Sequence, residues 1–362
     1  TGSSDVCSSD LYRMPADELD DRIWAAKSAL GDRLVVLGHH YQRDDVIKFA
    51  DYTGDSFKLS QMAAAKKEAD YILFCGVHFM AESADILSGP HQRVTLPDLK
   101  AGCHMADMAD IDAVEECWDD LMETVGESVV PITYMNSAAD LKAFVGRYQG
   151  AVCTSSNARA ILEWSFAQKQ RVLFFPDEHL GRNVGWEMDV PLDAMIVWDP
   201  DKPYGGNTPD AIAASRIILW KGNCPVHQLF NAKHVQRLRE VFPDIQVLVH
   251  PECKHEVVKH ADLSGSTGFI VKTIEEAEPG SKWAIGTELH LVNRLAKEHP
   301  DKFIVSVDPN MCLCTTMNRI DPPHVAWVME NLVNGNVVNE IKVADDIAEW
   351  ALIALNRMLE IV

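Results

Sequence analysis

Two cysteines, Cys312 and Cys314, stand two residues apart in the stretch NMCLCTTMNR. Structural zinc sites usually pair cysteines in C-x-x-C knuckles, and this C-x-C pair has no second pair nearby. A metal bound here must therefore take its other ligands from distant parts of the chain. Cys103 in KAGCHMADM and Cys224 in WKGNCPVHQ are candidates, because both lie in turn-like contexts that contain Gly or Asn.

Acid–base groups follow two apolar runs. In LVVLGHHYQ, alternation along an extended chain lets His39 and Tyr41 point the same way while His40 points elsewhere. In IQVLVHPEC, His250 and Glu252 end an apolar strand, where desolvation can raise the pKa of a carboxyl toward working pH and make it a proton shuttle. A strand-end histidine with a satisfied hydrogen bond and a surface-capping glutamate are the open alternatives.

Turns rich in serine and threonine precede three helical patterns, in GDSFKLS, CTSSNARAILE and GSTGFIVKT. N-capping explains most turns of this kind. Several in one chain, together with Tyr134 and Asn136 of TYMNS, can instead hold phosphate or carboxylate groups on backbone N–H groups. Both interpretations stay open at this level.

The formal charge of −21 opposes binding to nucleic acid and to anionic membrane surfaces. It also repels an anionic substrate at long range, so a site for one must be built locally from helix N-termini, hydroxyl groups or a metal. The sequence contains no run of about 18 apolar residues that could cross a bilayer. We therefore expect neither a nucleic-acid nor a membrane partner.

The nine cysteines, without a signal peptide or regular spacing, indicate a reducing, cytoplasmic compartment. Cys75, Cys117 and Cys153 lie among apolar or helical residues, and we expect them to pack in the core. The N-terminal run TGSSDVCSSDL shows no apolar signal core, and VCSSDL is what a common sequencing adapter encodes in one frame. We expect residues 1–11, with Cys7, to be an assembly artefact and leave them out of the fold prediction.

Short β-rich runs alternate with helical periodicity: LVVLGHHYQ, DYILFCG, VVPITYMNS, GAVCTSSN, RVLFFPDEH, RIILWKGNCPVH, IQVLVHPEC and KFIVSVDPN. This alternation favours α/β layers with parallel sheets, in which ligands bind beyond the carboxyl ends of the strands. LVVLGHHYQ, VVPITYMNS and IQVLVHPEC look like three versions of one unit. Residues 185–215, rich in Pro, Gly and Trp, indicate an inserted excursion or lid, and residues 322–362 show helical periodicity.

The ordered set of motifs resembles the quinolinate synthase family over almost all of residues 33–343. The matching stretches are GHHYQ, GDSFKLSQMA, GVHFMAESADIL, LPDLKAGCHMADM, TYMNSAADLKA, VCTSSNARAIL, FFPDEHLGRNV, LWKGNCPVH, VHPEC, GSTGFIV, GTELHLVNRLAKEHPDK and CTTM followed by NLVNG. Their order and spacing carry the resemblance, rather than any single fragment.

The resemblance implies three similar three-layer α/β/α domains with parallel sheets around a pseudo-threefold axis. We place the domains at residues 12–108, 109–222 and 223–318, with the excursion near residues 185–215 in the second. C-terminal helices at residues 319–362 are expected to pack on the body.

The resemblance also implies one [4Fe–4S] cluster held by one cysteine from each domain. The matching positions are Cys103, Cys224 and Cys314, where Cys314 and Met317 form the Cys-x-x-Met of the third ligand and Cys312 is a neighbour. Three thiolates on four irons leave one iron open to substrate as a Lewis acid.

The implied reaction condenses iminoaspartate with dihydroxyacetone phosphate, releases phosphate and water, and yields quinolinate, the precursor of NAD. By resemblance His39, Tyr41 and Glu252 handle protons and His250 supports them. The residues that would hold the carboxylates and the phosphate are Ser56, Tyr134, Asn136, Ser155, Ser266 and Thr267. A functional link to an aspartate-oxidising enzyme, which would supply iminoaspartate, is expected.

Departures from the family pattern include His40, where a Tyr or Asn is common, and Cys253 directly after Glu252. Whether Cys253 or Cys312 ever replaces a ligand stays open. So do two rival functions. A zinc- or iron-dependent hydrolase would use His39, His40 and His250 as ligands, and a non-enzymatic iron–sulfur redox sensor would have a cluster ligated entirely by protein.

Overall fold

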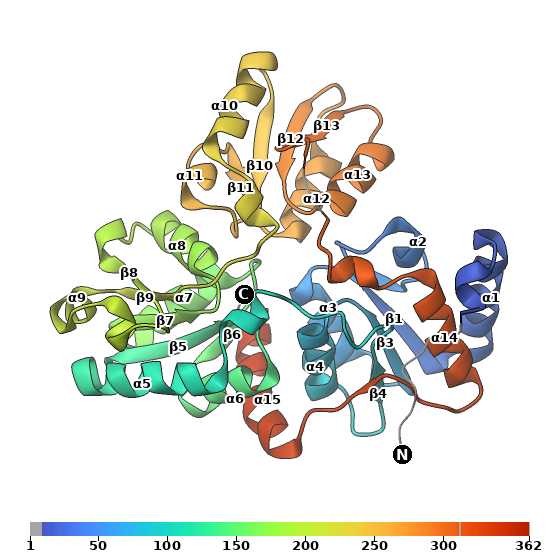
Figure 1. Ribbon diagram of the computed structural model, residues 1–362, viewed down its shortest axis with the longest axis horizontal. Helices are drawn as coiled ribbons and strands as arrows, with labels where there is room; N and C mark the ends of the chain where they lie inside the picture. Colours follow the sequence, from blue (N-terminus) through green and yellow to red (C-terminus); the bar gives the residue numbers. More distant parts are fainter. Residues whose placement is uncertain (1–8, 311–312, 362) are drawn as a thin grey trace. The chain divides into compact units, whose positions relative to one another are not determined.

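The computed structural model describes residues 9–310 and 313–361 as an α/β protein with three mostly parallel sheets flanked by helices (Figure 1). The predicted α/β class is confirmed. Contacts divide the described chain into two compact units: residues up to 103 with 313–343, and residues 104–310 with 344–361. Within the described residues, no helix combines the length and apolar character needed to cross a membrane.

The first unit contains one sheet, in the order β14-β4-β3-β1-β2. All six residues of β1 are buried, as expected for a parallel strand with helices on both faces. The two-residue strand β14 pairs antiparallel with β4 at the edge, and the other pairings are parallel. The strands are β1 (Leu34–His39), β2 (Tyr52–Gly54), β3 (Tyr71–Cys75), β4 (Arg93–Thr95) and β14 (Glu340–Ile341).

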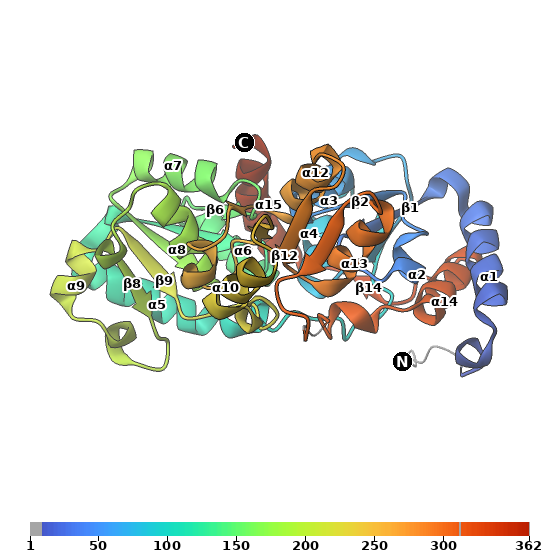
Figure 2. The same cartoon turned by 90° about the horizontal axis from the view of Figure 1, so that it is seen from above.

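The helices of the first unit are α1 (Ala16–Leu30), α2 (Asp44–Ile47), α3 (Ser56–Ala65), α4 (His78–Leu87) and α14 (Pro322–Val333). α1 and α14 pack side by side (Figure 2), and Arg22 donates two hydrogen bonds to Glu330, at 2.6 and 2.7 Å. Leu11 is buried in a short 3₁₀ helix that contacts α14. The expectation that residues 1–11 are an artefact stays a prediction, and residues 1–8, with Cys7, lie outside the described residues.

The second unit contains two sheets, of which the first has the order β6-β5-β7-β9-β8 and is parallel throughout. Its strands are β5 (Val129–Tyr134), β6 (Ala151–Cys153), β7 (Arg171–Phe175), β8 (Met195–Trp198) and β9 (Ile217–Trp220). Its helices are α5 (Ile111–Val125), α6 (Ala139–Arg147), α7 (Ala158–Gln168), α8 (Glu178–Glu187) and α9 (Pro209–Ala214).

The segment at residues 185–215 extends this sheet. β8 pairs with β9 along four residues and forms the sheet edge, and α9 follows it. Its Pro and Gly residues mark turns around this paired strand, and the interpretation of the segment as an inserted excursion or lid stays a prediction.

The other sheet of the second unit has the parallel order β11-β10-β12-β13. Its elements are β10 (Gln246–Val249), β11 (Leu263–Ser264), β12 (Lys282–Gly286), β13 (Phe303–Ser306), α10 (Ala232–Val241), α11 (His255–Val258), α12 (Thr267–Glu276) and α13 (Leu289–Glu298). The C-terminal helix α15 (Asp345–Glu360) packs against α6 and β6 in the same unit (Figure 2).

One strand order recurs in the three sheets: β2-β1-β3-β4, β6-β5-β7-β9 and β11-β10-β12-β13. The three runs predicted to be versions of one unit are β1, β5 and β10, and each is the first strand of its sheet and lies between the second and third. The prediction of three similar α/β units is thus confirmed in strand order. The proposed domain boundaries at residues 108, 222 and 318 stay a prediction.

Candidate active site

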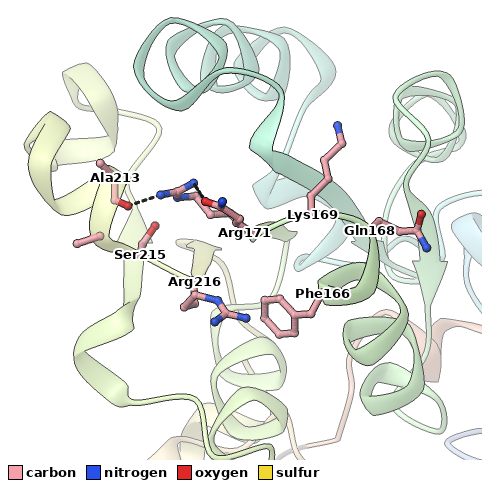
Figure 3. Close-up of a pocket in the computed structure, with 9 residues that line it drawn as sticks. Phe166, Gln168, Lys169, Arg171, Ala213, Ser215 and Arg216 are labelled. Atoms are coloured by element: carbon pink, nitrogen blue, oxygen red, sulfur yellow. Dashed lines mark hydrogen bonds between the residues drawn. The ribbon is translucent and has the colours of Figure 1, made fainter.

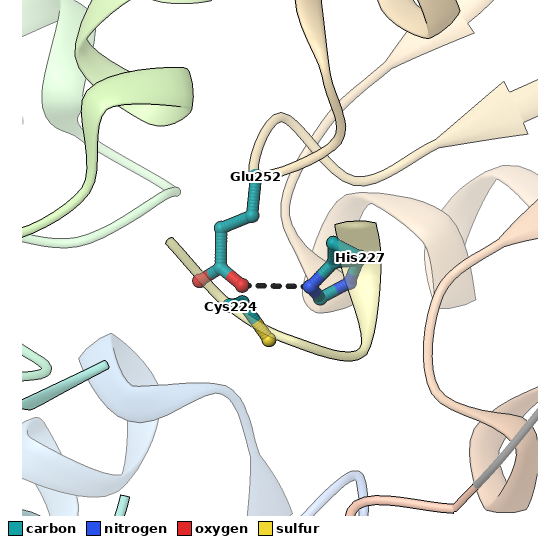
Figure 4. A group of neighbouring side chains, drawn as sticks. All are labelled: Cys224, His227 and Glu252. Carbon is teal, nitrogen blue, oxygen red and sulfur yellow. Dashed lines mark ion pairs between the residues drawn. The ribbon is translucent and has the colours of Figure 1, made fainter. Parts of the chain in front are cut away.

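Glu252 lies in a buried polar cluster of the second unit (Figure 4). It stands in the turn after β10, and Tyr134 is the last residue of β5, so both come from carboxyl ends of parallel strands, where ligands bind in such sheets. The Tyr134 hydroxyl donates a hydrogen bond to Glu252 Oε1 at 2.6 Å. Glu252 is only 4% exposed and Tyr134 5%. A pair 118 residues apart in sequence is thus fixed in a desolvated contact.

Two histidine rings lie on the other side of this carboxylate. His227 Nδ1 is 2.8 Å from Glu252 Oε2, and His227 is fully buried. His250 stacks on His227, with ring centroids 4.8 Å apart and planes at 25°, and its Nδ1 lies 3.9 Å from Glu252 Oε2. His227 Nε2 is 3.2 Å from the Thr287 hydroxyl. His227 therefore contacts the Glu252 carboxylate with one ring nitrogen and the Thr287 hydroxyl with the other.

The surroundings of Glu252 decide its charge. Burial raises the pKa of this carboxyl, but His250, then His227, and the hydrogen bonds from His227 and Tyr134 outweigh burial and lower the pKa to about 2. The expectation that desolvation brings this pKa up toward working pH is therefore wrong. Glu252 is ionised near neutral pH, so it can accept a proton but has none to donate, and its low pKa makes it a weak base.

A second buried carboxyl, Asp177, behaves in the opposite way. Its Oδ1 caps α8 by accepting from the backbone N–H groups of His179 and Leu180 at 2.7 and 3.1 Å, and its Oδ2 has no hydrogen-bond partner among the described residues. Burial, and then the charge of Glu252, raise the pKa of Asp177 well above its ordinary value. The surroundings thus move the pKa values of Asp177 and Glu252 in opposite directions, a division typical of functional sites.

The thiol of Cys224 completes a group of metal-ligating side chains. One ligand atom each from Cys224, His227 and Glu252 lie within 4.8 Å of one another. In the part of the chain that the structure describes, this is the one group of three or more such residues. Sulfur, imidazole and carboxylate are ligands that suit zinc and iron. His227 was not predicted as a site residue, although the Cys-x-x-His spacing in CPVH is a pattern typical of metal ligands.

The three candidate cysteines occupy equivalent positions in the repeated unit. Each follows the strand at the fourth place of the recurring order, which is β4, β9 or β13, and precedes a 3₁₀ helix by three residues. Seven residues after each cysteine stands a residue whose side chain caps the N-terminus of the next helix. The cysteines are Cys103, Cys224 and Cys314, the 3₁₀ helices are Ala106–Met108, His227–Leu229 and Met317–Arg319, and the capping residues are Asp110, Asn231 and Asp321.

Exposure separates these three cysteines from the other four described ones. Cys103, Cys224 and Cys314 are partly exposed, whereas Cys75, Cys117, Cys153 and Cys253 are buried. Burial raises the pKa of Cys75 to about 12, and the pKa values of the other three buried thiols are raised as well. The core role predicted for Cys75, Cys117 and Cys153 is confirmed. Cys312 lies outside the described residues.

In the first unit, His39 and Tyr41 lie together at the end of β1. Their ring centroids are 4.8 Å apart, and the Tyr41 backbone N–H donates to His39 Nδ1 at 3.1 Å. The His40 ring is farther from His39, at 6.4 Å. Ser56 opens α3, whose N-terminal cap is Asp55.

The remaining predicted residues belong to the second unit. Asn136 and Ser155 follow β5 and β6 and are partly exposed. Ser266 caps α12 by accepting from the Phe269 backbone N–H at 3.2 Å, so the capping alternative holds for this serine. Thr267 is buried, and its hydroxyl has no hydrogen-bond partner among the described residues. That hydroxyl, at a helix N-terminus, suits an anionic ligand.

A surface pocket of about 480 Å³ lies elsewhere on this unit, at the amino ends of β7 and β9 (Figure 3). Two of its three cationic side chains are already engaged. Arg171 donates to Ser128 Oγ and to the Ala213 carbonyl, and Arg216 stacks on Phe166. Since ligands of parallel sheets bind at the carboxyl ends of strands, the Glu252 cluster is the better candidate site.

Comparison with known proteins decides the family. The family model described as "Quinolinate synthetase A protein" matches residues 21–360. A quinolinate synthase from a Nocardioides species is 58% identical over 361 residues, covering 98% of this chain and 92% of that protein. The chain belongs to the quinolinate synthetase A family.

Other relatives agree. A quinolinate synthase from Halalkalibacterium halodurans is 55% identical over 352 residues, covering 97% of this chain and 96% of that protein. One from Acidobacterium capsulatum is 54% identical over 362 residues, covering 99% and 97%. The resemblance inferred from the motifs is confirmed, and with it the expectation that the chain is an enzyme.

Tyr134→Phe tests the contact at the centre of this family member's site. The variant loses one hydrogen bond to a charged acceptor, an interaction worth about 1.5–3 kcal/mol. We therefore expect the free energy of unfolding to fall by about this amount, and turnover to fall by about 10- to 100-fold because the Glu252 carboxylate is no longer fixed. Steady-state kinetics beside a melting curve measure both. Unchanged turnover would mean that the Glu252 carboxylate does not need Tyr134.

Proposed function

We propose that the chain condenses iminoaspartate with dihydroxyacetone phosphate to form quinolinate, with loss of phosphate and water, in the biosynthesis of NAD. Family membership supports the proposal. The observation that carries it is the buried Glu252 carboxylate, held between Tyr134, His227 and His250 and within reach of Cys224. Ring closure with dehydration needs repeated proton transfers, and a fixed carboxylate beside histidines suits that task.

A [4Fe–4S] cluster held by Cys103, Cys224 and Cys314 fits these residues. Thiolates are the usual cluster ligands, and these cysteines share one position in the repeat and are the partly exposed ones among those described. When bound, the cluster would supply a Lewis-acidic iron that has no protein ligand. Local positive character of this kind offsets the acidic surface that anionic substrates meet.

The chain's own residues provide the proton chemistry. Glu252, ionised near neutral pH, accepts a substrate proton, and His227 beside it, held by Thr287, stabilises the carboxylate. Tyr134 holds the Glu252 carboxylate in place by donating to Oε1. His39 and Tyr41 provide a second acid–base pair, because they lie together at a strand end.

Hydroxyl and amide groups bind the substrate anions. Thr267, with a buried hydroxyl at the N-terminus of the ten-residue helix α12, is the strongest candidate of these. The full proposed set is Ser56, Tyr134, Asn136, Ser155, Ser266 and Thr267. Iminoaspartate would come from an enzyme that oxidises aspartate, and we place the reaction in the cytoplasm.

The metal-ligating group favours one alternative. Cys224, His227 and Glu252 could bind zinc with a fourth position open, the pattern of a zinc hydrolase. This set differs from the His39, His40 and His250 set predicted for a hydrolase. Of those three, His250 contacts Glu252, and no described group of metal ligands includes any of them.

Metal and product analysis separates the functions. Protein reconstituted anaerobically with iron and sulfide is expected to hold iron and acid-labile sulfide in similar amounts and to form quinolinate from the two substrates. Protein that binds zinc but no sulfide, and that hydrolyses a substrate instead of forming quinolinate, would favour the hydrolase. A stable cluster without any product would favour the redox sensor.

A further inference from the structure

The turn that carries Glu252 is held from outside by the side chain of Asn183. This residue lies in the middle of α8 and is fully buried. Its Nδ2 donates to the carbonyl oxygens of Pro251 and Cys253, both at 2.8 Å. These carbonyls belong to the residues immediately before and after Glu252. One amide group therefore binds the backbone on both sides of Glu252, the proposed proton acceptor.

The orientation of this amide is fixed by chemistry. Two carbonyl oxygens can only accept, so the NH₂ end of Asn183 must face them. Its Oδ1 then faces His255 Nδ1 at 2.9 Å, which must carry the proton. Burial, and then Arg182, lower the pKa of His255, so a neutral ring protonated on Nδ1 meets this demand. The Trp186 indole packs against the ring, with centroids 5.0 Å apart.

The same turn has two further supports. Gln228 Nε2 lies 3.3 Å from the Glu252 carbonyl, so three consecutive carbonyls each accept from a side-chain amide. Inside the turn, the Cys253 backbone N–H donates to the His250 carbonyl at 3.0 Å, and the Glu252 N–H to His250 Nδ1 at 3.3 Å. Asn183 contributes two of these three bonds from side-chain amides and, unlike Gln228, is fully buried.

We propose that Asn183 is a positioning residue for the reaction: by binding the carbonyls of Pro251 and Cys253, it holds the Glu252 carboxylate against Tyr134 and His227. The proposal rests on the proposed function, because it takes Glu252 as the group that moves the proton. Asn183 does not contact the carboxylate itself. A displacement of about 1 Å at a reacting group costs on the order of 100-fold in rate, so a loosened turn is expected to be catalytically costly.

Asn183→Ala removes both donors and leaves room for water to satisfy the freed carbonyls. We expect kcat for quinolinate formation to fall about 100-fold with KM for both substrates nearly unchanged. Iron and sulfide contents should match the wild type. Hydrogen exchange in residues 250–254 should accelerate, because the N–H groups of Glu252 and Cys253 lose the support of a fixed turn. Asn183→Gln, which keeps the amide, should recover part of kcat.

Asn207→Ala is the matched control. The Asn207 amide also grips carbonyls, those of Val197, Tyr204 and Gly205 at 2.9, 3.3 and 3.1 Å, but in the segment around β8. A purely structural role predicts similar losses of melting temperature and similar kinetics in both variants. We expect kcat and exchange at residues 250–254 to stay normal in Asn207→Ala. An equal fall of kcat in the two variants, or a normal kcat in Asn183→Ala, overturns the proposal.

His255→Phe keeps the test decisive if Asn183→Ala does not fold. Phenylalanine retains a ring against Trp186 but cannot donate to Asn183 Oδ1. The loss of one hydrogen bond should lower kcat about fivefold and speed exchange at residues 250–254, and the absence of both effects contradicts the proposal.

If the wild type forms no quinolinate, the proposed function fails. Hydrogen exchange in Asn183→Ala and Asn207→Ala then still decides, without any kinetic measurement, whether Asn183 holds the turn.

Discussion

Cys314→Ser is expected to lose most of its iron and sulfide and all quinolinate formation after anaerobic reconstitution. Serine is a poor replacement for a thiolate, and only three protein ligands are proposed for the cluster. Cys103→Ser and Cys224→Ser should behave in the same way, because the three residues hold the same position in the repeated unit. Iron and acid-labile sulfide counts per chain measure the effect.

Cys312→Ser is the control that the sequence offers. Cys312 comes two residues before the repeat position that Cys314 fills, so its replacement should leave iron, sulfide and product formation near wild type. Cys253→Ser should also keep the cluster, because Cys253 is fully buried. A cluster that survives in Cys314→Ser and disappears in Cys312→Ser would show that the wrong sulfur of the pair was chosen.

Glu252→Gln should keep the cluster but slow quinolinate formation by about two to four orders of magnitude, the usual range for a lost acid or base. Glutamine has nearly the same shape and can still accept from Tyr134, but it cannot take a proton near neutral pH. The wild-type carboxylate is ionised near neutral pH and so offers an acceptor, because His250, His227 and Tyr134 outweigh burial and hold its pKa at about 2. Visible absorption and steady-state kinetics of the same preparation give the two readouts.

Glu256→Gln provides the comparison for that variant. Glu256 is exposed in α11, four residues further along the chain. Its change removes the same charge without touching the Tyr134–His227 cluster, so turnover should stay near wild type. If Glu252→Gln turned over as fast as Glu256→Gln, Glu252 would have no part in the mechanism.

The sequence was a good guide to which strands would carry polar groups. The alternation of apolar runs with helical periodicity predicted parallel sheets, and the carboxyl ends of β1, β5 and β10 carry or precede His39, Tyr134 and Glu252 as expected. Local pattern is enough for this, because a strand buried on both faces must be apolar and its polar residues can stand only where it ends.

Contacts between segments far apart in the sequence could not be predicted from local sequence patterns. Asn183 sits inside a helix, 68 residues before the first carbonyl it binds, and nothing in HLGRNVGW marks it as special. The direction of the Glu252 pKa shift was mispredicted partly for the same reason. The lowering effect of His250 comes from within HPEC itself, whereas that of His227 requires knowing that CPVH packs against HPEC.

Elements with weak sequence signals were also missed. β14 has two residues and no periodicity, yet it closes the edge of the first sheet beside β4. β8 lies in a stretch whose Pro and Gly residues suggested a lid, and its partner β9 supplies the pairing that makes it a strand. In both cases an existing sheet edge, rather than intrinsic propensity, decides the structure.

The most direct test of the central claim counts quinolinate and phosphate together, in one anaerobic reaction of reconstituted protein with iminoaspartate and dihydroxyacetone phosphate. The proposed condensation predicts one phosphate released for each quinolinate formed, and neither product when either substrate is omitted. Phosphate released from dihydroxyacetone phosphate alone, or substrates left unchanged by protein with a full complement of iron and sulfide, would contradict it.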